Sequence, residues 1–219
     1  MLLFAAYELK ITDYRAAATQ HRLQQQLSRT WTEPEVVPTR DKGPAATTAT
    51  PTRPAKDRLG ITPPPAVLDS QGFAVIRIPR FGADYHWVAV EGVSTSDLEM
   101  GPGHYPGTAL PGQIGNVVFS GHRTTYGHPF WDADLLRPGD AIDIQVRDRI
   151  YRYRVTGSRN VDPSDIAVTY PVPDQPGVKP TSRLLTLTTC TPRFSAAQRL
   201  VVSAELAVND VLPAPVGAG

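Results

Sequence analysis

The stretch Leu184-Leu-Thr-Leu-Thr-Thr-Cys190-Thr-Pro-Arg-Phe-Ser-Ala-Ala-Gln-Arg199 contains the only cysteine of the 219-residue chain. Apolar and polar residues alternate from Leu185 through Leu187, which is typical of a β-strand. Pro192 cannot donate a ladder hydrogen bond, so we expect the strand to end within about two residues of Cys190. Cys190 is therefore predicted at a strand end, held by a sheet and open on one side, where a thiol can act as a nucleophile.

Composition limits the classes of protein to consider. The length allows one domain with appendages, and the hydrophobic content of 41% is enough for a core. The net charge of +1 and the lack of a basic run give no argument for a nucleic-acid partner. A single cysteine excludes an intramolecular disulfide and a multi-cysteine zinc site, and the histidines have no metal-ligand spacing. We therefore expect no metal and no cofactor.

The chain divides into four segments. We expect an N-terminal helix over 1–31, a Pro/Thr/Ala-rich linker over 32–67, a folded catalytic domain over 68–212 and a flexible tail over 213–219. Residues 1–9 are apolar but too few to cross a bilayer, which takes about 20. They are either the first turns of an ordinary helix or, as we favour, the end of a membrane helix that begins upstream. Alternatively, the N-terminal region is a disordered extension with no tether.

The pattern of residues 8–29 predicts a polar helix with a thin apolar stripe through Leu23 and Leu27. We expect such a helix to have little apolar surface to pack against the rest of the protein. The sequence of the folded domain predicts short strands and almost no long helix. We therefore expect an all-β barrel or sandwich. A capped helical turn at Ser94 and a short helix over 130–136 interrupt the strands. The expected strands are 73–79, 85–93, 116–120, 141–147, 151–155, 184–189 and 200–208, with a hairpin turn at 148–149.

A reactive thiol needs a proton carrier and a cation. The ordinary pKa of a cysteine is about 8.5, so only a few per cent is thiolate at neutral pH. His122 follows a buried strand just as Cys190 does, and Arg199 opens the last strand, within reach of Cys190 if the two final strands are neighbours. Taken singly, Cys190 could be an inert core thiol, His122 a loop histidine and Arg199 a solvent-facing cation. Together they predict cysteine acyl-transfer chemistry.

Four sequence segments resemble the sortases, which are cysteine transpeptidases of Gram-positive cell surfaces. Their residues are most similar to those of the class E sortases of actinobacteria. The segments are Gly103-His-Tyr-Pro-Gly-Thr-Ala109, Gly121-His-Arg-Thr-Thr-Tyr-Gly127, Leu136-Arg-Pro-Gly-Asp140 and Leu185-Thr-Leu-Thr-Thr-Cys190. The resemblance covers roughly 70–210. It implies an eight-stranded β-barrel, with Cys190 as nucleophile, His122 as general acid and then base, and Arg199 as donor to the developing oxyanion.

The resemblance also implies the substrates. Cys190 would cleave a Leu-Pro-X-Thr-Gly or Leu-Ala-X-Thr-Gly sorting signal between Thr and Gly, and a peptidoglycan-precursor amine would take the acyl group. Tyr105 is the tyrosine that class E sortases use to read Ala at the second signal position, although it could instead pack its loop on the barrel. By strand alternation Thr188 is expected to line the groove. The enzyme would be membrane-anchored, with its catalytic domain outside the cell.

The other histidines, a calcium site and two other functions are the alternatives to this prediction. His128 lies in a Gly-His-Pro turn and is a weak candidate for the proton carrier, while His104 and His86 are expected at the surface. The loop 171–182 holds Asp174 as its only acid, too few for the calcium site of some sortases. A pilin-polymerising sortase and a catalytically idle surface β-barrel remain the alternatives.

Overall fold

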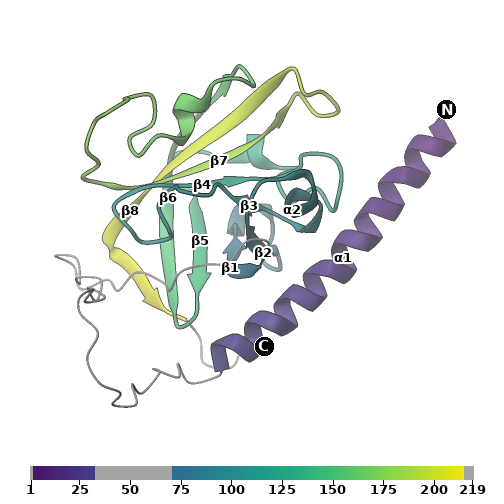
Figure 1. Cartoon of the computed structure of the whole chain (residues 1–219), viewed down its shortest axis with the longest axis horizontal. Helices are drawn as coiled ribbons and strands as arrows, with labels where there is room; N and C mark the ends of the chain where they lie inside the picture. The colour runs from purple at the N-terminus through teal and green to yellow at the C-terminus, as the bar shows by residue number, and fades with distance from the viewer. Residues whose placement is uncertain (1, 33–70, 215–219) are drawn as a thin grey trace, which may run out of the picture.

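A closed barrel of eight strands forms the body of the protein (Figure 1). The computed structural model describes residues 2–32 and 71–214, so all but the first residue of the predicted linker lies outside the described residues, as does most of the predicted tail. The strands follow one another around the barrel in the order β1-β2-β3-β4-β7-β8-β6-β5. The prediction of an eight-stranded barrel is therefore confirmed, and the sandwich alternative is wrong.

Most predicted strands are present with shifted ends. The strand elements are β1 (Gly72–Arg77), β2 (His86–Glu91), β3 (Gly103–His104), β4 (Gly115–Ser120), β5 (Ala141–Val146), β6 (Arg149–Val161), β7 (Arg183–Thr191) and β8 (Gln198–Pro213). The helical elements are α1 (Leu2–Thr32), α2 (Thr95–Met100) and the short 3-10 turns η1 (Pro79–Phe81), η2 (Ala133–Leu135) and η3 (Ile166–Thr169). Strand β7 ends one residue before Pro192, as the missing N–H of proline predicts.

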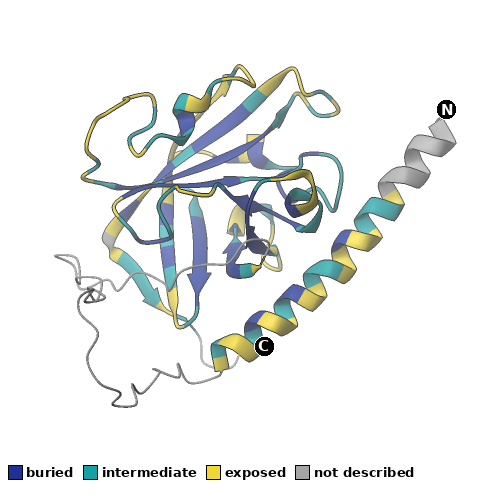
Figure 2. Ribbon diagram, in the orientation of Figure 1, coloured by how far each residue is buried: buried dark blue, intermediate teal, exposed yellow. Residues whose placement is uncertain are grey.

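The barrel interior is the hydrophobic core. Inward side chains from all the long strands bury one another, as the dark ribbon segments of Figure 2 show. On β7 the inward set is Leu185 and Leu187, which leaves Thr186, Thr188 and Cys190 on the outer face because side chains alternate along a strand. The alternation that predicted this strand therefore also decides which face carries the thiol.

The predicted helical turn at Ser94 and the predicted hairpin are present, whereas the helix predicted over 130–136 is shorter than expected. Ser94 caps α2 with a capping box, in which its hydroxyl accepts from the Asp97 N–H and the Asp97 carboxylate accepts from the Ser94 N–H. Strands β5 and β6 form the predicted hairpin, but its turn is at 147–148, one residue before the predicted 148–149. The helix expected over 130–136 is reduced to η2, because the Trp131 carbonyl accepts hydrogen bonds from the side chains of Arg123 and Arg193 instead of from a helical N–H.

Helix α1 packs along the outside of the barrel (Figure 1). Its buried side chains include Leu23 and Leu27, which join Val75 of β1 and Val88 and Val90 of β2 in a second apolar cluster. The expectation that this helix has little to pack on is wrong. Its apolar stripe is thin, but it is wide enough to cover the outer face of β1 and β2. No helix among the described residues is long and apolar enough to cross a membrane.

Candidate active site

Strands β7 and β8 place Cys190 opposite Arg199. The two strands are antiparallel and hydrogen-bonded neighbours, and their register pairs Cys190 with Arg199 directly. Side chains of such a pair lie on the same face with Cβ atoms about 5 Å apart. The thiol and the guanidinium therefore share one outer face of the barrel. Both residues are only partly buried, so they remain accessible from that face.

The tripeptide Gly121-His122-Arg123 is held against the end of β7 on both sides. The Gly121 N–H donates to the Thr188 carbonyl at 3.2 Å, and the Thr189 hydroxyl donates to the Gly121 carbonyl at 2.7 Å. On the other side Arg123 donates from Nη1 to the Cys190 carbonyl at 3.4 Å. His122 is thus fixed beside the three residues that end in the thiol, although it lies 68 positions earlier in the chain.

Burial and one neighbouring charge act on His122 in opposite directions. Desolvation lowers the pKa of His122 below its ordinary value, and the negative charge of Glu99 partly opposes this shift. The ring lies against Tyr126, with centroids 5.0 Å apart, and the Tyr126 hydroxyl donates to Glu99 at 2.9 Å. Within residues 2–32 and 71–214, His122 Nε2 is the one buried side-chain nitrogen or oxygen without a hydrogen-bond partner. A neutral imidazole with an unpaired nitrogen is suited to exchanging a proton.

Arg199 points its guanidinium along its own loop. Its Nη1 donates to the carbonyls of Ala196 at 3.1 Å and Gln198 at 3.2 Å. These bonds hold the cation at the strand end while the register keeps it on the face of Cys190. A guanidinium has five N–H donors, so donors remain for an oxyanion formed at the thiol.

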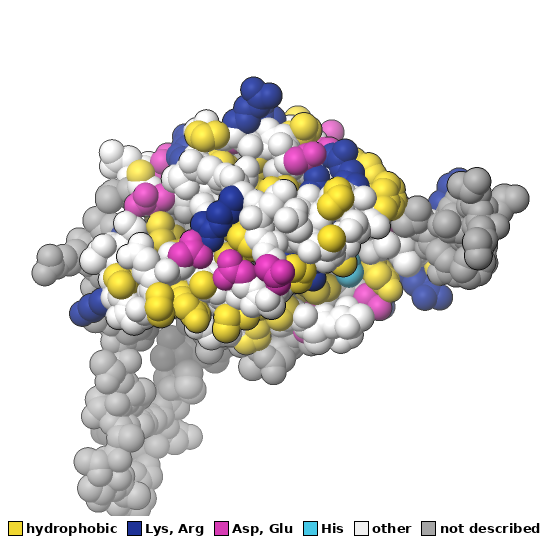
Figure 3. Space-filling model, turned by 90° about the horizontal axis from the view of Figure 1, so that it is seen from above, with side chains coloured by type: hydrophobic (Ala, Val, Ile, Leu, Met, Phe, Trp, Pro, Cys, Tyr) yellow, Lys and Arg dark blue, Asp and Glu magenta, His cyan; other side chains and the backbone are white. Residues whose placement is uncertain are grey.

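The β7–β8 loop is clamped to the loop that follows His122. Arg193 donates to the Trp131 carbonyl, forms ion pairs with Asp132 and Asp134, and lies over the Trp131 ring at 4.6 Å. Arg123, buried to 3% exposure, reaches the same carbonyl and pairs with Asp134 at 2.8 Å. Two arginines therefore fix one rim of the site. From above, side chains of both charges and hydrophobic side chains are interspersed on this side of the molecule (Figure 3).

The outer face of β4 and β7 adjoins Cys190. Thr188 lies on this face, paired with Ser120 and Val201 on the adjoining strands. Tyr105 follows β3 and donates its N–H to the Val118 carbonyl of β4, and by alternation from the inward His104 its ring belongs to the outer face. The far end of β4 borders a pocket of about 340 Å³, lined by residues that include Asn116, Thr169 and Pro171.

His104 is not at the surface, and that prediction is wrong. It is 1% exposed, its Nδ1 lies 2.7 Å from a Glu91 carboxylate oxygen, and its Nε2 lies within hydrogen-bond distance of Thr108 and the Ala109 carbonyl. The pair ties the loop after Tyr105 to β2. His86 is exposed as predicted. His128 lies with its Nδ1 3.6 Å from Asp13 of α1. Among the described residues, no three His, Cys, Asp or Glu side chains gather to hold a metal ion.

The sortase domain family matches residues 76–207, which is more than half of the chain. The chain belongs to the sortase family. It is 33% identical over 210 residues to sortase SrtE1 of Streptomyces coelicolor, covering 92% of this chain and 52% of the relative. It is also 29% identical to sortase SrtE2 of the same organism over 167 residues, 69% of this chain and 64% of the relative. This sortase chain thus spans about half to two thirds of the length of these curated relatives.

Solved sortases have the same fold. Sortase E of Streptomyces avermitilis is 38% identical with a TM-score of 0.61, over 69% of this chain and 97% of that one. The SrtF sortase of Corynebacterium diphtheriae is 29% identical with a TM-score of 0.65, over 70% and 92%. Sortase E1 of S. coelicolor, solved with a tripeptide in its active site, is 36% identical with a TM-score of 0.61, over 70% and 98%. The resemblance to sortases, and to class E in particular, is confirmed.

Several residues that shape the site were missed in the sequence. Arg123 directly follows His122, and its place next to a candidate proton carrier was a usable signal. Glu99 and Tyr126 come from different elements and meet only through the fold. The hydrogen bond between Glu91 and His104 likewise joins β2 to β3, and no periodicity in the sequence links the two residues.

Proposed function

We propose that this sortase domain is a cysteine transpeptidase that cleaves a sorting signal between Thr and Gly and transfers the acyl part to an amine. The observation that carries the proposal is the meeting of three strand ends. Cys190 and Arg199 are register partners, and the peptide that bears His122 is hydrogen-bonded to Thr188, Thr189 and Cys190. Membership of the sortase family supports the reaction type.

In the first half of the reaction the Cys190 thiol gives its proton to the His122 imidazole, and the sulfur attacks the carbonyl carbon of the signal threonine. The carbonyl electrons move to oxygen, and Arg199 donates a hydrogen bond to the resulting oxyanion. The tetrahedral intermediate collapses, the C–N bond to glycine breaks, and His122 gives the departing amine a proton. The product is a thioester between Cys190 and the threonine carbonyl.

In the second half an amine attacks the thioester. His122 takes a proton from the attacking nitrogen, a C–N bond forms, and the Cys190 sulfur leaves as thiolate and takes that proton from His122. The enzyme returns to its starting state without oxidation or reduction. We place the acceptor in a peptidoglycan precursor, so that the reaction attaches a secreted protein to the cell wall at the outer face of the membrane.

The outer face of β4 and β7 would hold the signal peptide. The pocket at Asn116 lies beside Leu184 of β7, six residues before Cys190, which is about 20 Å along a strand. An extended peptide of five or six residues spans about the same length. The signal residues before threonine would therefore lie over Thr188 and Tyr105, with Tyr105 contacting the Ala or Pro of the second position.

The test is incubation with peptides that end in Leu-Ala-X-Thr-Gly or Leu-Pro-X-Thr-Gly, with and without an amine. Mass spectrometry follows the thioacyl adduct and the transfer product. We expect Cys190→Ala to abolish the adduct, and His122→Ala and Arg199→Ala to slow transfer by about 100-fold or more. His86→Ala and Arg137→Ala, at exposed positions, are the matched controls and should leave the rate unchanged.

Tyr105→Phe, which removes only a hydroxyl, should lower transfer from the Ala signal more than from the Pro signal. Transfer by Cys190→Ala would overturn the mechanism. Hydrolysis alone under an excess of varied amines would make the domain a peptidase, and reaction with a lysine of a pilin-type protein in place of a cell-wall amine would make it a pilin polymerase.

A further inference from the structure

We infer that α1 positions His122 and is thereby part of the catalytic architecture, acting through Asp13 and Gln20. The inference rests on the proposed function, in which His122 moves the proton. Helix α1 reaches the active site at two places, the loop that carries His122 and the end of α2. A hydrogen bond from Tyr126 to Glu99 joins those two places beside the His122 ring.

The first contact is between Asp13 and the loop after His122. Asp13 Oδ1 accepts a hydrogen bond from the Gly127 N–H at 2.8 Å and lies 3.6 Å from His128 Nδ1. Gly127 has a φ of 72°, and a Cβ added there would come within 2.4 Å of the Trp87 ring and 3.3 Å of the Ala16 methyl group. The loop backbone is therefore pressed between α1 and β2, and only glycine fits.

The neighbour of Gly127 carries this contact to the proton carrier. Tyr126 also has a positive φ, 51°, and its ring lies against His122 at a centroid distance of 5.0 Å. The peptide that joins Tyr126 to Gly127 has the Asp13-bound N–H on one side and the Tyr126 Cα on the other. A shift of that peptide therefore moves the ring on which His122 rests.

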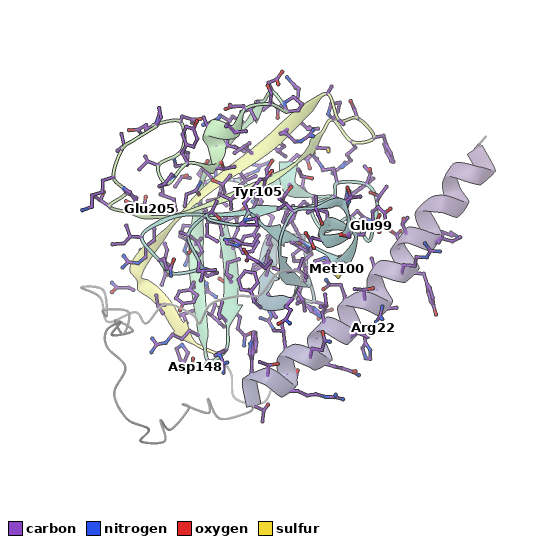
Figure 4. All side chains as sticks on the ribbon, viewed as in Figure 1. Arg22, Glu99, Met100, Tyr105, Asp148 and Glu205 are labelled. Atoms are coloured by element: carbon purple, nitrogen blue, oxygen red, sulfur yellow. The ribbon has the colours of Figure 1, made fainter. Side chains whose placement is uncertain are left out.

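The second contact is between Gln20 and the end of α2. The Gln20 carbonyl oxygen accepts from the Val88 N–H at 2.7 Å, and its amide donates to the carbonyls of Val88 at 3.0 Å and Met100 at 2.7 Å. Gly101 lets the side chain approach, because a Cβ there would lie 2.4 Å from Gln20 Nε2. Met100 adjoins Glu99, and both lie on the side of the barrel that faces α1 (Figure 4).

Helix α1 thus holds both partners of the Tyr126–Glu99 hydrogen bond. Asp13 fixes the loop that supplies the tyrosine, and Gln20 fixes the helix end that supplies the carboxylate. That carboxylate also favours the protonated imidazole, which the leaving amine needs. A helix that served only as a tether would not need either contact.

The experiment compares full-length variants in the peptide-transfer assay, with thermal melting and NMR of the His122 imidazole as readouts that do not depend on activity. Asp13→Ala removes the acceptor of the Gly127 N–H, whereas Asp13→Asn keeps an acceptor oxygen and removes the charge. Gln20→Ala is matched by Gln25→Ala, an exposed glutamine on the same helix. Tyr126→Phe keeps the ring and removes the bond to Glu99.

We expect Asp13→Ala to lower kcat roughly five- to tenfold with KM nearly unchanged, because the reacting groups are misplaced but the groove is intact. The His122 signal should shift in the same variant, and Asp13→Asn should restore both. Gln20→Ala should lower kcat while Gln25→Ala should not. Asp13→Ala and Tyr126→Phe combined should cost less than the product of the two single effects, because both act through one ring.

Two results would overturn the inference. One is wild-type kcat and a wild-type His122 signal in Asp13→Ala and Gln20→Ala. The other is a fall in activity that only follows the unfolded fraction seen on melting. Failure of the proposed function would look different, because His122→Ala would then keep transfer activity whereas the NMR response of His122 to Asp13→Ala would still decide whether α1 positions the ring.

Discussion

At the scale of single residues, the chemistry depends on a histidine in an environment that penalises its charge. Burial lowers the pKa of His122 and Glu99 only partly compensates. The neutral ring is favoured at rest, so a proton must be supplied to it when the leaving amine develops.

This environment predicts how stability depends on pH. Because the folded pKa of His122 lies below the unfolded value, the unfolded chain takes up the proton first as the pH falls through about 6.5, and the folded state loses free energy of unfolding until its own imidazole is protonated. Urea unfolding at pH 7 and pH 5 should show a larger loss for the wild type than for His122→Gln. The exposed-site control His86→Gln should match the wild type, and equal losses in all three proteins would refute the prediction.

The positions of some single residues could be predicted from the sequence and those of others could not. Cys190 and Arg199 could be placed because alternation and a proline define their strands. His104 could not, because it lies in a stretch rich in Gly and Pro with no periodicity, and its partner Glu91 comes from another strand. A buried hydrogen bond between side chains of two strands leaves no local pattern in the sequence, so a histidine flanked by turn residues was wrongly predicted at the surface.

At the scale of elements, the site is built by clamping two loops together beyond the ends of β4 and β7. Arg123 binds the carbonyls of Trp131 and Cys190 and the carboxylate of Asp134. Arg193 reaches Trp131 and Asp134 from the opposite loop. The same bonds take the Trp131 carbonyl away from helix formation, which explains why the apolar pattern of 130–136 predicted a helix that the structure reduces to η2.

Arg123→Lys tests this clamp. A single ammonium cannot reach the three acceptors that the guanidinium spans, so a buried carbonyl loses its partner and the free energy of unfolding should fall by about 1–3 kcal/mol. Peptide transfer should fall more than about tenfold, because the Cys190 and His122 backbones lose their tie. Urea unfolding and the transfer assay measure the two effects, with Arg137→Lys in an exposed turn as control. Wild-type transfer by Arg123→Lys would show that the clamp is dispensable.

At the scale of the whole molecule, the barrel could be predicted and the place of α1 could not. Strand alternation and turn residues define the sheet locally, whereas α1 docks through a thin stripe and through Gln20, whose partners are backbone groups that any sequence would offer. Next to the short strand β3, Gln20 hydrogen-bonds to β2 as a neighbouring strand would. Strand β3 pairs with Val90 and Glu91 of β2 but not with Val88, so Gln20 supplies the partners of the Val88 N–H and carbonyl.

Undocking α1 should therefore leave the backbone N–H and carbonyl of Val88 without their Gln20 partners. Leu27→Asp puts a charge into the apolar cluster with Val75 and Val88, and burial of an unpaired carboxylate is unfavourable enough to displace the helix. Hydrogen exchange should then show faster exchange of the Val88 amide, whose acceptor is Gln20, while amides in the centre of β8 such as Val202 keep their protection. Gln26→Asp, on the exposed face one residue away, should leave both unchanged. If Val88 stayed equally protected in Leu27→Asp, α1 would not be what satisfies this edge in solution, and the route from Gln20 to Glu99 would lose its support.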